Sequence, residues 1–239
     1  MAGGIYVALS GMRARFEQLD RLAADLANAE TAGYKAERGG TAAVNRPFAS
    51  VLDAAVDTAP TPPKIDFRAG MVADTGRDLD MAIDGSGFFV VETPGGPRYT
   101  RNGHFQRRAD GTLTTSDGMV VSGENGPIKL GSGTATVKAD GTVVSGGTPA
   151  GKLQVVNFDD TLTLSRAEAG RFRAADGVTP KPVAARMVRG GALEQSNVSV
   201  VERMAHLTEV SRSFDALRRG LSLIANDIDA KAISELGRR

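Results

Sequence analysis

Two stretches with the same apolar spacing lie at opposite ends of this chain, and the middle of the chain lacks that spacing. Near the start, the spaced apolar residues are Ile5, Leu9, Met12, Phe16, Leu19, Ala23 and Leu26. Near the end, they are Leu207, Val210, Phe214, Leu217, Leu221, Ile224 and Ile228. Both sets alternate steps of three and four residues, which is the pattern of a coiled-coil seam. We therefore expect two terminal helices that pair with each other and present their apolar seam to further copies of the chain.

The first predicted helix covers residues 4–29 and ends between Asn28 and Gly33, because Asn and Gly suit a left-handed helix cap. The second predicted helix lies within residues 192–236, with Ser196-Asn197 as its expected N-cap region. Proline and glycine residues between positions 36 and 70 predict an extended connector. The expected organisation is a helical assembly domain made of residues 1–35 and 192–239, a connector over 36–70, and a β domain over 71–191.

Turn chemistry predicts the β domain. The Asx-Gly pairs, which accept the positive φ of tight hairpin turns, all fall inside it. They are Asp84-Gly85, Asn102-Gly103, Asp110-Gly111, Asp117-Gly118, Asn125-Gly126, Asp140-Gly141 and Asp176-Gly177. The strand candidates are Gly87–Thr93, Arg98–Arg101, His104–Arg108, Thr112–Thr115, Met119–Val121, Thr134–Lys138, Lys152–Phe158 and Val183–Val188. The predicted fold class is α+β, with paired N- and C-terminal coiled-coil helices and a central antiparallel β domain, either a sandwich or an open barrel.

The composition excludes several classes of function. A net charge of +1 over 239 residues provides no general positive field for nucleic acid or an anionic membrane. The absence of cysteine excludes disulfides and thiol chemistry. No apolar run reaches the length of a membrane span, so no membrane insertion is expected. The N-terminal residues lack a basic region followed by a long apolar one, so we expect no cleavable secretion signal.

The two histidines do not indicate a hydrolase. His104 follows the Asn102-Gly103 turn, which predicts a strand residue. His206 precedes the seam residue Leu207, which predicts an exposed position on the helix. We therefore predict no catalytic residue and no enzyme activity.

The acidic cluster Asp78, Asp80 and Asp84 invites a calcium interpretation, but its spacing does not fit an EF-hand loop. We expect a strand that ends in the Asp84-Gly85 turn. The fragment Gly85-Ser-Gly87 is followed by a strand pattern rather than a helix, which does not fit a dinucleotide loop. The arginines at 98, 101, 107 and 108 lack an aromatic stacking platform, and we interpret them as a solvated sheet face. No metal and no cofactor is predicted.

Three stretches resemble one known family. Residues 25–35, with Asn28, Thr31, Gly33, Tyr34 and Lys35, resemble the "Leu-Ala-Asn…Thr-x-Gly-Tyr-Lys" signature that ends the N-terminal helix of flagellar rod and hook proteins. Residues 70–105 resemble the central "Thr-Gly…Leu-Asp-x-Ala-Ile…Gly-Phe-Phe…Tyr-Thr-Arg-x-Gly-x-Phe" block of that family. The third stretch, which resembles the "Leu-Glu-x-Ser-Asn-Val" element before the C-terminal helix, contains Leu193, Glu194, Ser196, Asn197 and Val198.

The resemblance implies a structural subunit of the bacterial flagellar basal-body rod. Such a protein packs its terminal helices into the inner layer of a tube and carries the β domain outside. Its implied partners are copies of itself, other rod subunits and the flagellar export apparatus. Its implied location is the rod in the periplasmic space, reached through the flagellar type III channel without a cleaved signal. Within the family, length and C-terminal sequence favour the proximal-rod branch over the distal-rod branch.

Two other classes of function stay open at this point. A soluble coiled-coil adaptor could use the Asx-Gly turns of its β domain to display ligand-binding loops. An enzyme such as a peptidoglycan hydrolase is the weaker alternative, because the chain has no spare segment for a hydrolase domain.

Overall fold

The computed structural model describes residues 2–38, 64–183 and 187–236, with only the backbone described for residues 2–10, 221 and 223–236. The chain divides into two compact units. The helix unit contains the two long helices. The β unit contains residues 28–36 and 65–198, so it includes the segments that carry the first and third sequence motifs. Neither helix, in the part that the structure describes, has an apolar stretch long enough to cross a bilayer.

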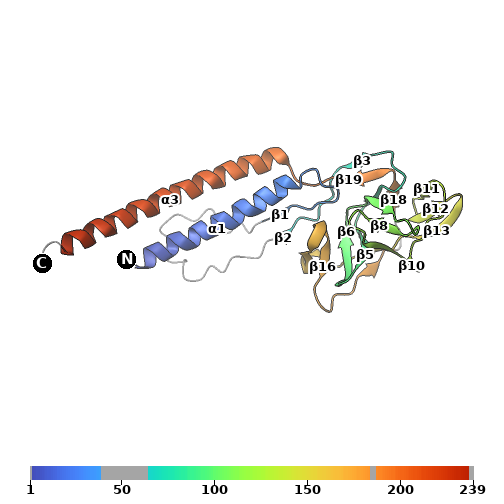
Figure 1. The fold of residues 1–239 in the computed structure, drawn as a ribbon, viewed down its shortest axis with the longest axis horizontal. Coiled ribbons are helices and arrows are strands. Elements are labelled where there is room, and N and C mark those ends of the chain that lie inside the picture. Colours follow the sequence, from blue (N-terminus) through green and yellow to red (C-terminus); the bar gives the residue numbers. More distant parts are fainter. Residues whose placement is uncertain (1, 39–63, 184–186, 237–239) are drawn as a thin grey trace. The chain divides into compact units, whose positions relative to one another are not determined.

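The helix unit is built from α1 (Ala2–Ala27) and α3 (Val200–Leu236). The two helices lie side by side and run in opposite directions (Figure 1). The predicted helix over 4–29 is confirmed within two residues at each end. The predicted second helix is wrong at its start, because residues 192–194 form a strand and α3 begins at Val200. Ser199 caps α3, since its Oγ accepts a hydrogen bond from the Glu202 N–H at 3.4 Å.

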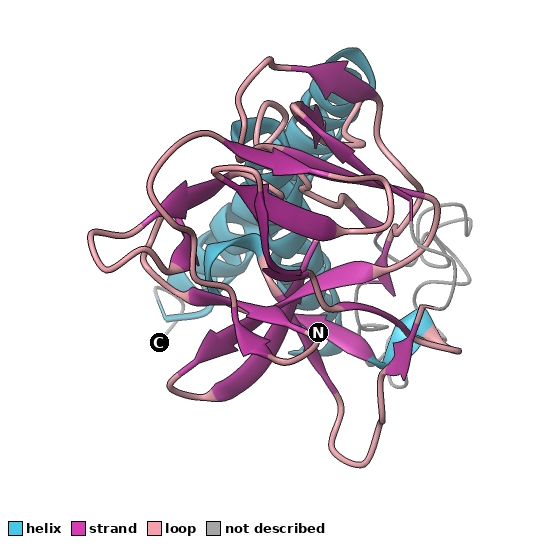
Figure 2. Cartoon of the chain, turned by 90° about the vertical axis from the view of Figure 1, so that its right-hand side faces the viewer, coloured by secondary structure: helices cyan, strands magenta, loops and turns pink. Residues whose placement is uncertain are grey.

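The strands of the β unit, drawn in magenta in Figure 2, pair antiparallel and are joined by turns and loops. Its main sheet has the order β15–β16–β6–β5–β9–β8–β7, with β10 paired to β9 and with β14 paired to both β5 and β17. These strands are β5 (Phe88–Thr93), β6 (Gly96–Thr100), β7 (Phe105–Arg107), β8 (Leu113–Thr115), β9 (Val120–Gly123), β10 (Gly126–Pro127), β14 (Val155–Asn157), β15 (Leu164–Arg166), β16 (Phe172–Ala174) and β17 (Lys181–Pro182).

The other strands make smaller sheets. A three-stranded sheet joins β11 (Ala135–Val137), β12 (Thr142–Ser145) and β13 (Thr148–Lys152). Three strand pairs are β4 (Met81–Asp84) with β18 (Met187–Gly190), β3 (Val72–Asp74) with β19 (Ala192–Glu194), and β1 (Glu37–Arg38) with β2 (Lys64–Ile65). Two short 3-10 turns, η2 (Thr161–Thr163) and η3 (Glu168–Gly170), flank β15. The prediction of an α+β chain with a central antiparallel β domain is confirmed.

Strand β5 lies inside the main sheet, and its side chains pack in two different hydrophobic clusters. Phe89 packs in one cluster with Phe105, and the two rings lie edge to face with their centroids 5.2 Å apart. Phe88 and Val90 point to the opposite face and pack in the second cluster with Phe172. Successive side chains of a strand alternate between faces, so an uninterrupted apolar run suits a strand that is covered on both sides.

The predicted Asx-Gly turns are present, and the glycine has the expected positive φ in all but one of them. Six of the seven glycines have positive φ, namely Gly85, Gly111, Gly118, Gly126, Gly141 and Gly177. Gly103 is not among the glycines with positive φ. A Cβ at that position would lie 1.7 Å from the Met81 carbonyl oxygen, so Gly103 is needed for close backbone approach rather than for its dihedral angle.

Candidate assembly site: the junction of the three sequence motifs

A buried carboxylate brings the three sequence motifs together in the β unit. Glu194 is 1% exposed, and its Oε1 lies 2.5 Å from Nζ of Lys35. Its Oε2 accepts a hydrogen bond from Nη1 of Arg101 at 3.1 Å. The Gly70 N–H also donates to Oε1 at 3.0 Å. Lys35 comes from the first motif, Gly70 and Arg101 from the central block, and Glu194 from the third motif.

Backbone pairing fixes the position of Glu194. The residue ends β19, opposite Val72 of β3. Its carbonyl oxygen accepts the Gly33 N–H at 2.7 Å, and the next residue, Gln195, donates its N–H to the Met71 carbonyl at 2.7 Å. The first motif and the start of the central block are therefore held on both sides of the Glu194 main chain.

Arg101 lies inside the β unit, not on a solvated sheet face, so the predicted exposure of this residue was wrong. It is 5% exposed, and its Nη2 donates to the Gly85 carbonyl at 2.7 Å. Its guanidinium carbon lies 5.4 Å from the centre of the Phe88 ring. Arginine is suited to this place because its planar group can bond a carboxylate and carbonyls while it rests on an aromatic face. Arg107 and Arg108 are exposed, as predicted.

Two cationic side chains, those of Lys35 and Arg101, lie beside the one buried carboxylate of Glu194. Burial lowers the pKa of Lys35 below the ordinary lysine value, and the hydrogen bond and attraction of Glu194 offset part of that effect. Burial likewise lowers the pKa of Arg101, and Glu194 again acts in the opposite direction. Glu194 is therefore the group that keeps two desolvated cations compatible with the folded state.

Two glycines permit the close approach of these segments. A Cβ at Gly33, where φ is +68°, would lie 2.2 Å from the backbone nitrogen of Asn102. A Cβ at Gly70 would lie 1.9 Å from the carbonyl oxygen of Gln195. Contacts this short are impossible for a side chain, so both positions require glycine. Gly70 and Arg101 were not predicted as site residues, although both lie in the central sequence block.

Asn197 closes the junction from the side of the third motif. Its Oδ1 accepts the Ala36 N–H at 2.8 Å, and its Nδ2 donates to the carbonyls of Asp66 and Arg68 at 2.7 and 3.1 Å. Its amide is thus satisfied by the β unit, which explains why Asn197 does not cap the C-terminal helix. Tyr34 lies nearby with its ring 4.5 Å below the guanidinium of Arg166.

The remaining motif residues shape the backbone around the junction. Thr31 Oγ1 lies 3.2 Å from Asn28 Oδ1, and the Thr31 N–H donates to the Asn28 carbonyl at 3.1 Å, which forms the turn after α1. Ser196 Oγ accepts the Val198 N–H at 3.2 Å. Leu193 is half-buried opposite Ala73.

The structure places the predicted seam residues of the helix unit unevenly. Val210 is buried and Phe16 is 56% exposed. The half-buried seam residues are Met12, Leu19, Leu26, Leu207, Phe214 and Leu217. The side chains of Ile5, Leu9, Leu221, Ile224 and Ile228 lie outside the described residues. His206 is exposed, as predicted.

The helix unit also contains a buried polar contact that the seam pattern did not predict. Leu22 is buried, although it lies outside the seam. Asp25 is 1% exposed, and its Oδ2 lies 3.2 Å from Nε of Arg203 on α3. Its Oδ1 accepts the Glu37 N–H at 3.3 Å. A single buried polar pair between helices favours one register over others.

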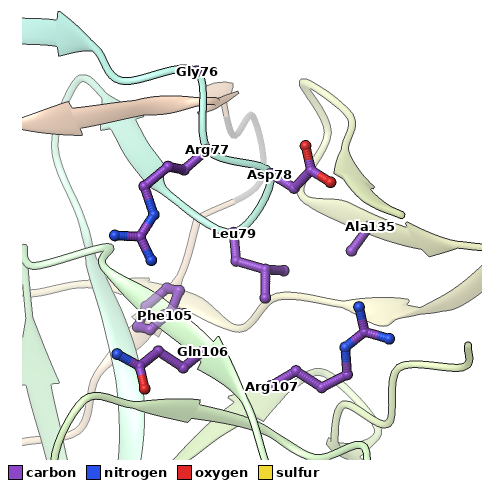
Figure 3. A pocket seen from close by; sticks show the side chains of 8 residues that line it. All are labelled: Gly76, Arg77, Asp78, Leu79, Phe105, Gln106, Arg107 and Ala135. Carbon is purple, nitrogen blue, oxygen red and sulfur yellow. The ribbon is translucent and has the colours of Figure 1, made fainter. Parts of the chain in front are cut away.

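An open hollow of about 490 Å³ lies on the β unit (Figure 3). Its lining includes Arg77, Asp78, Phe105 and Arg107. Phe105 is 1% exposed, and the Arg107 guanidinium donates to two backbone carbonyls of its own unit, those of Gly131 and Gly133. The hollow thus offers little apolar surface and few converging polar groups, which is unlike a typical small-molecule pocket.

His104 and Asp80 contact each other next to residues that line this hollow. His104 Nδ1 lies 2.8 Å from Asp80 Oδ1, and the two residues form an antiparallel bridge. Among the described residues, no three His, Asp or Glu side chains gather in a way that could hold a metal ion. The strand predicted to end at Asp84-Gly85 is confirmed as β4.

Comparison with known proteins gives relatives that match along nearly the whole chain. A flagellar basal-body rod protein FlgF of Rhizobium meliloti is 34% identical, with 99% of each chain covered. The protein of the same name from Caulobacter vibrioides is 32% identical over all of this chain and 99% of its own. The chain belongs to the flagellar basal-body rod protein family.

Within the rod protein family, the chain is most like FlgF; a flagellar basal-body rod protein FlgG of Bacillus subtilis is 27% identical over 90% of this chain and 92% of its own. Residues 82–145 match the family described as flagellar hook protein FlgE/F/G D1 domain, and residues 189–219 match the flagellar basal body rod FlgEFG protein C-terminal family. These matched regions contain Arg101 and Glu194 respectively. A rod protein is a structural protein, so the prediction of no enzyme activity is confirmed.

Proposed function

We propose that this chain is an axial subunit of the flagellar rod that polymerises through its terminal helices and so helps the rod to transmit torque. The observation that carries the proposal is the apolar surface left uncovered on the helix unit. Phe16 is 56% exposed on α1, and Val201 and Met204 are 80% and 52% exposed on α3. An apolar surface of this kind on a member of a rod family supports binding to neighbouring subunits.

The energetics favour assembly over an isolated helix pair. Full burial of a large apolar side chain contributes roughly 1.5–3 kcal/mol. Ordering one residue of backbone costs about 1–2 kcal/mol, so two helices that bury few side chains gain little when alone. Neighbouring copies that cover the exposed side chains would shift this balance, and helix stability would then depend on assembly.

The proposal extends to organisation and location. Residues 1–35 and 192–239 act together in assembly, through the seam residues and the family motif residues. The partners are copies of this chain and other rod subunits, and the chain reaches the periplasmic space through the flagellar export apparatus without a cleaved signal. The family of the chain supports these points.

A charge on the seam tests the proposal. Leu217 is half-buried, and its Cδ1 lies 4.0 Å from where a Cβ on Gly11 would be, so it faces the other helix. We expect Leu217→Asp to abolish recovery of the chain with isolated basal bodies and to abolish swimming. Ala216→Asp is the matched control, because it adds the same charge at the adjacent exposed position. Wild-type recovery of the Leu217→Asp chain would overturn polymerisation through the helices.

Limited proteolysis of the isolated protein gives a second test. If the helices are stabilised by assembly, protease should remove the segments that form α1 and α3 first and leave a resistant fragment close to residues 28–198. Mass spectrometry of the fragments would locate the cuts. Resistance of both helices in the isolated chain would contradict the coupling of helix stability to assembly.

A further inference from the structure

Helix α1 contacts α3 through residues that do not belong to its apolar seam. Asp25 Oδ2 lies 3.2 Å from Nε of Arg203, and a Cβ on Gly11 would lie 4.0 Å from Cδ1 of Leu217. Among the α1 side chains that the structure describes, only those of Leu22 and Asp25 are buried. Gly11, Leu22 and Asp25 lie on one face of the helix, and this face is the one turned to α3.

The seam of α1 lies on a different face. Three of its residues, Met12, Ala23 and Leu26, each come one position after a residue of the contact face. One position turns an α-helix by about 100°, so the seam points away from the line of contact with α3. Phe16 of this seam is 56% exposed, Ala23 is exposed, and Met12, Leu19 and Leu26 are half-buried.

The seam of α3 behaves differently. Val210 is buried, and the other seam residues of α3 whose side chains the structure describes, Leu207, Phe214 and Leu217, are half-buried. In one copy, therefore, the seam of α3 covers the polar contact face of α1. The apolar seam of α1 is left without a described helix against it.

The end of α3 extends past the start of α1. Asp25 and Gly11 are 14 residues apart on α1, and so are Arg203 and Leu217 on α3, so the two antiparallel helices keep step with each other. Ala2, the first residue of α1, then lies level with residue 226. Residues 227–236, here named the α3 overhang, continue beyond α1 by about 15 Å (Figure 1).

The α3 overhang continues the apolar pattern of the helix. Ile228, Ala232 and Leu236 recur at steps of four residues, which places them along one face of α3. Earlier in the same helix, residues with this kind of spacing pack against α1. The overhang thus repeats a helix-binding pattern at a place that α1 of its own copy does not reach.

We infer that the α3 overhang of one copy packs on the α1 seam of a neighbouring copy in the assembled rod. Both surfaces carry apolar residues at steps of three or four, which suits them to pair as helices. Because the two surfaces are different, the contact is head-to-tail and can repeat into an open helical assembly. This inference rests on the proposed function and names the two surfaces that meet.

The overhang cannot cover the α1 seam of its own copy. Phe16 lies level with residue 212 of α3, and the overhang begins 15 residues further along that helix. The separation along the helix axis is therefore about 20 Å. A cross-link between Phe16 and the overhang can form only between two copies.

Photo-cross-linking at the seam tests the contact. The full chain with p-benzoylphenylalanine in place of Phe16, which keeps an aromatic side chain, would replace the wild-type chain in motile cells, and isolated basal bodies would be illuminated. We expect a product of twice the chain mass. After trypsin, mass spectrometry should find position 16 joined to the peptide that ends at Lys231 or at Arg238.

Two further chains complete the experiment. The matched control has the same photo-reactive residue in place of Ala14, which is exposed but lies on another face of α1, and it should give no such product. The reciprocal chain has the photo-reactive residue in place of Leu236 and should be joined to α1 of a second copy. This reciprocal chain decides the case in which the Phe16 variant does not assemble.

The outcomes separate the two proposals. Chains that are recovered with basal bodies but give no product above the Ala14 control would overturn the contact and leave the proposed function intact. A product of single-chain mass that joins position 16 to residues 39–63 would overturn it, because the chain's own segment would then cover the seam. A product formed only with a different protein would also overturn it. Failure of the wild-type chain to co-purify with basal bodies would overturn the proposed function itself.

Discussion

Glu194 and Lys35 lie 159 positions apart in the sequence and form an ion pair of 2.5 Å in which the side chains are 1% and 0% exposed. Arg101 completes the cluster from the middle of the chain at 3.1 Å. Buried ion pairs are not reliably stabilising as a whole, but the loss of one member leaves an uncompensated charge in a desolvated place. The role of this cluster in the rod protein is therefore to hold three segments in one arrangement.

Removal of the carboxylate should be severe. Glu194→Ala leaves Lys35 and Arg101 buried without their counter-ion, and we expect a loss of about 3–5 kcal/mol in the free energy of unfolding. Urea unfolding of the full chain, followed by circular dichroism, measures it. Glu124→Ala is the control, since Glu124 is 37% exposed at its side chain and pairs with Lys152 at 3.8 Å. That change should cost under about 1 kcal/mol. Equal losses of unfolding free energy in both variants would contradict the role of Glu194 as the counter-ion that holds the three segments together.

Removal of one cation should destabilise the chain less than removal of the carboxylate. Lys35→Met keeps much of the apolar stem and leaves Glu194 paired with Arg101, so we expect a smaller loss than that of Glu194→Ala. The single variants Lys35→Met and Glu194→Gln and the double variant that combines them form a mutant cycle. The loss of unfolding free energy in the double variant should differ from the sum of the two single losses by about 0.5–3 kcal/mol, because contacting residues are not independent. The same urea series gives all of these values. Strict additivity would show that the two residues are not coupled.

Two glycines with nearly the same dihedral angle separate steric clash from backbone strain. Gly33 and Gly76 have φ of +68° and +69°, but a Cβ would strike the Asn102 nitrogen at 2.2 Å in the first case and meet nothing within 4 Å in the second. Gly76→Ala should cost about 1–3 kcal/mol from strain alone. Gly33→Ala should cost clearly more and should prevent stable folding of the β unit. Thermal unfolding of both variants would test the difference, and similar melting temperatures would refute it.

Two hairpin aspartates should make the β unit sensitive to acid. The backbone N–H groups of Thr112 and Thr142 donate to Asp110 and Asp140 at 2.9 and 3.0 Å. These bonds lower the pKa of each carboxyl in the folded chain. A lowered folded pKa means that the contribution to stability is complete above the ordinary value of about 3.9 and is lost as the pH falls through the folded pKa below it.

The variant Asp110→Asn with Asp140→Asn tests this pH dependence. Each asparagine retains an oxygen acceptor for the same N–H, so stability near pH 5 should change little. The drop in urea midpoint between pH 5 and about pH 2 should be smaller than in the wild-type chain, because two groups no longer take up protons. An equal drop in both chains would rule out a contribution from these turns.

Local patterns predicted the two long helices and the strands β5 to β9, β11 and β14, but they did not predict β12, β15 or β16. The three-four spacing gave the long helices, and the Asx-Gly pairs gave the hairpins, because both signals depend only on residues close in sequence. Strand β13 was missed because Thr148–Lys152 contains Pro149 and Gly151, which disfavour a strand. The structure accommodates them at the edge of a three-stranded sheet, where the register shifts between Val143 and Val144.

The buried cluster could not be predicted from local patterns. Arg101 follows a strand among other arginines and has the sequence signature of a surface residue; only its partner, 93 positions away, explains its burial. The start of α3 was misplaced for a related reason. Asn197 has the residue type of a helix cap, but its amide bonds Ala36 and Asp66, which lie far from it in sequence. The residue types of Arg101 and Asn197 indicated a surface residue and a helix cap, but tertiary contacts bury Arg101 and bind the Asn197 side chain inside the β unit.

The pairing of β3 with β19 and of β4 with β18 sets an order of events for the newly made chain. Both early strands must wait for partners more than a hundred residues downstream, and long-range closure of this kind is slow. This part of the β unit could not close until the chain was present through residue 194, so its two earliest strands stay without their partners for most of the synthesis of the chain.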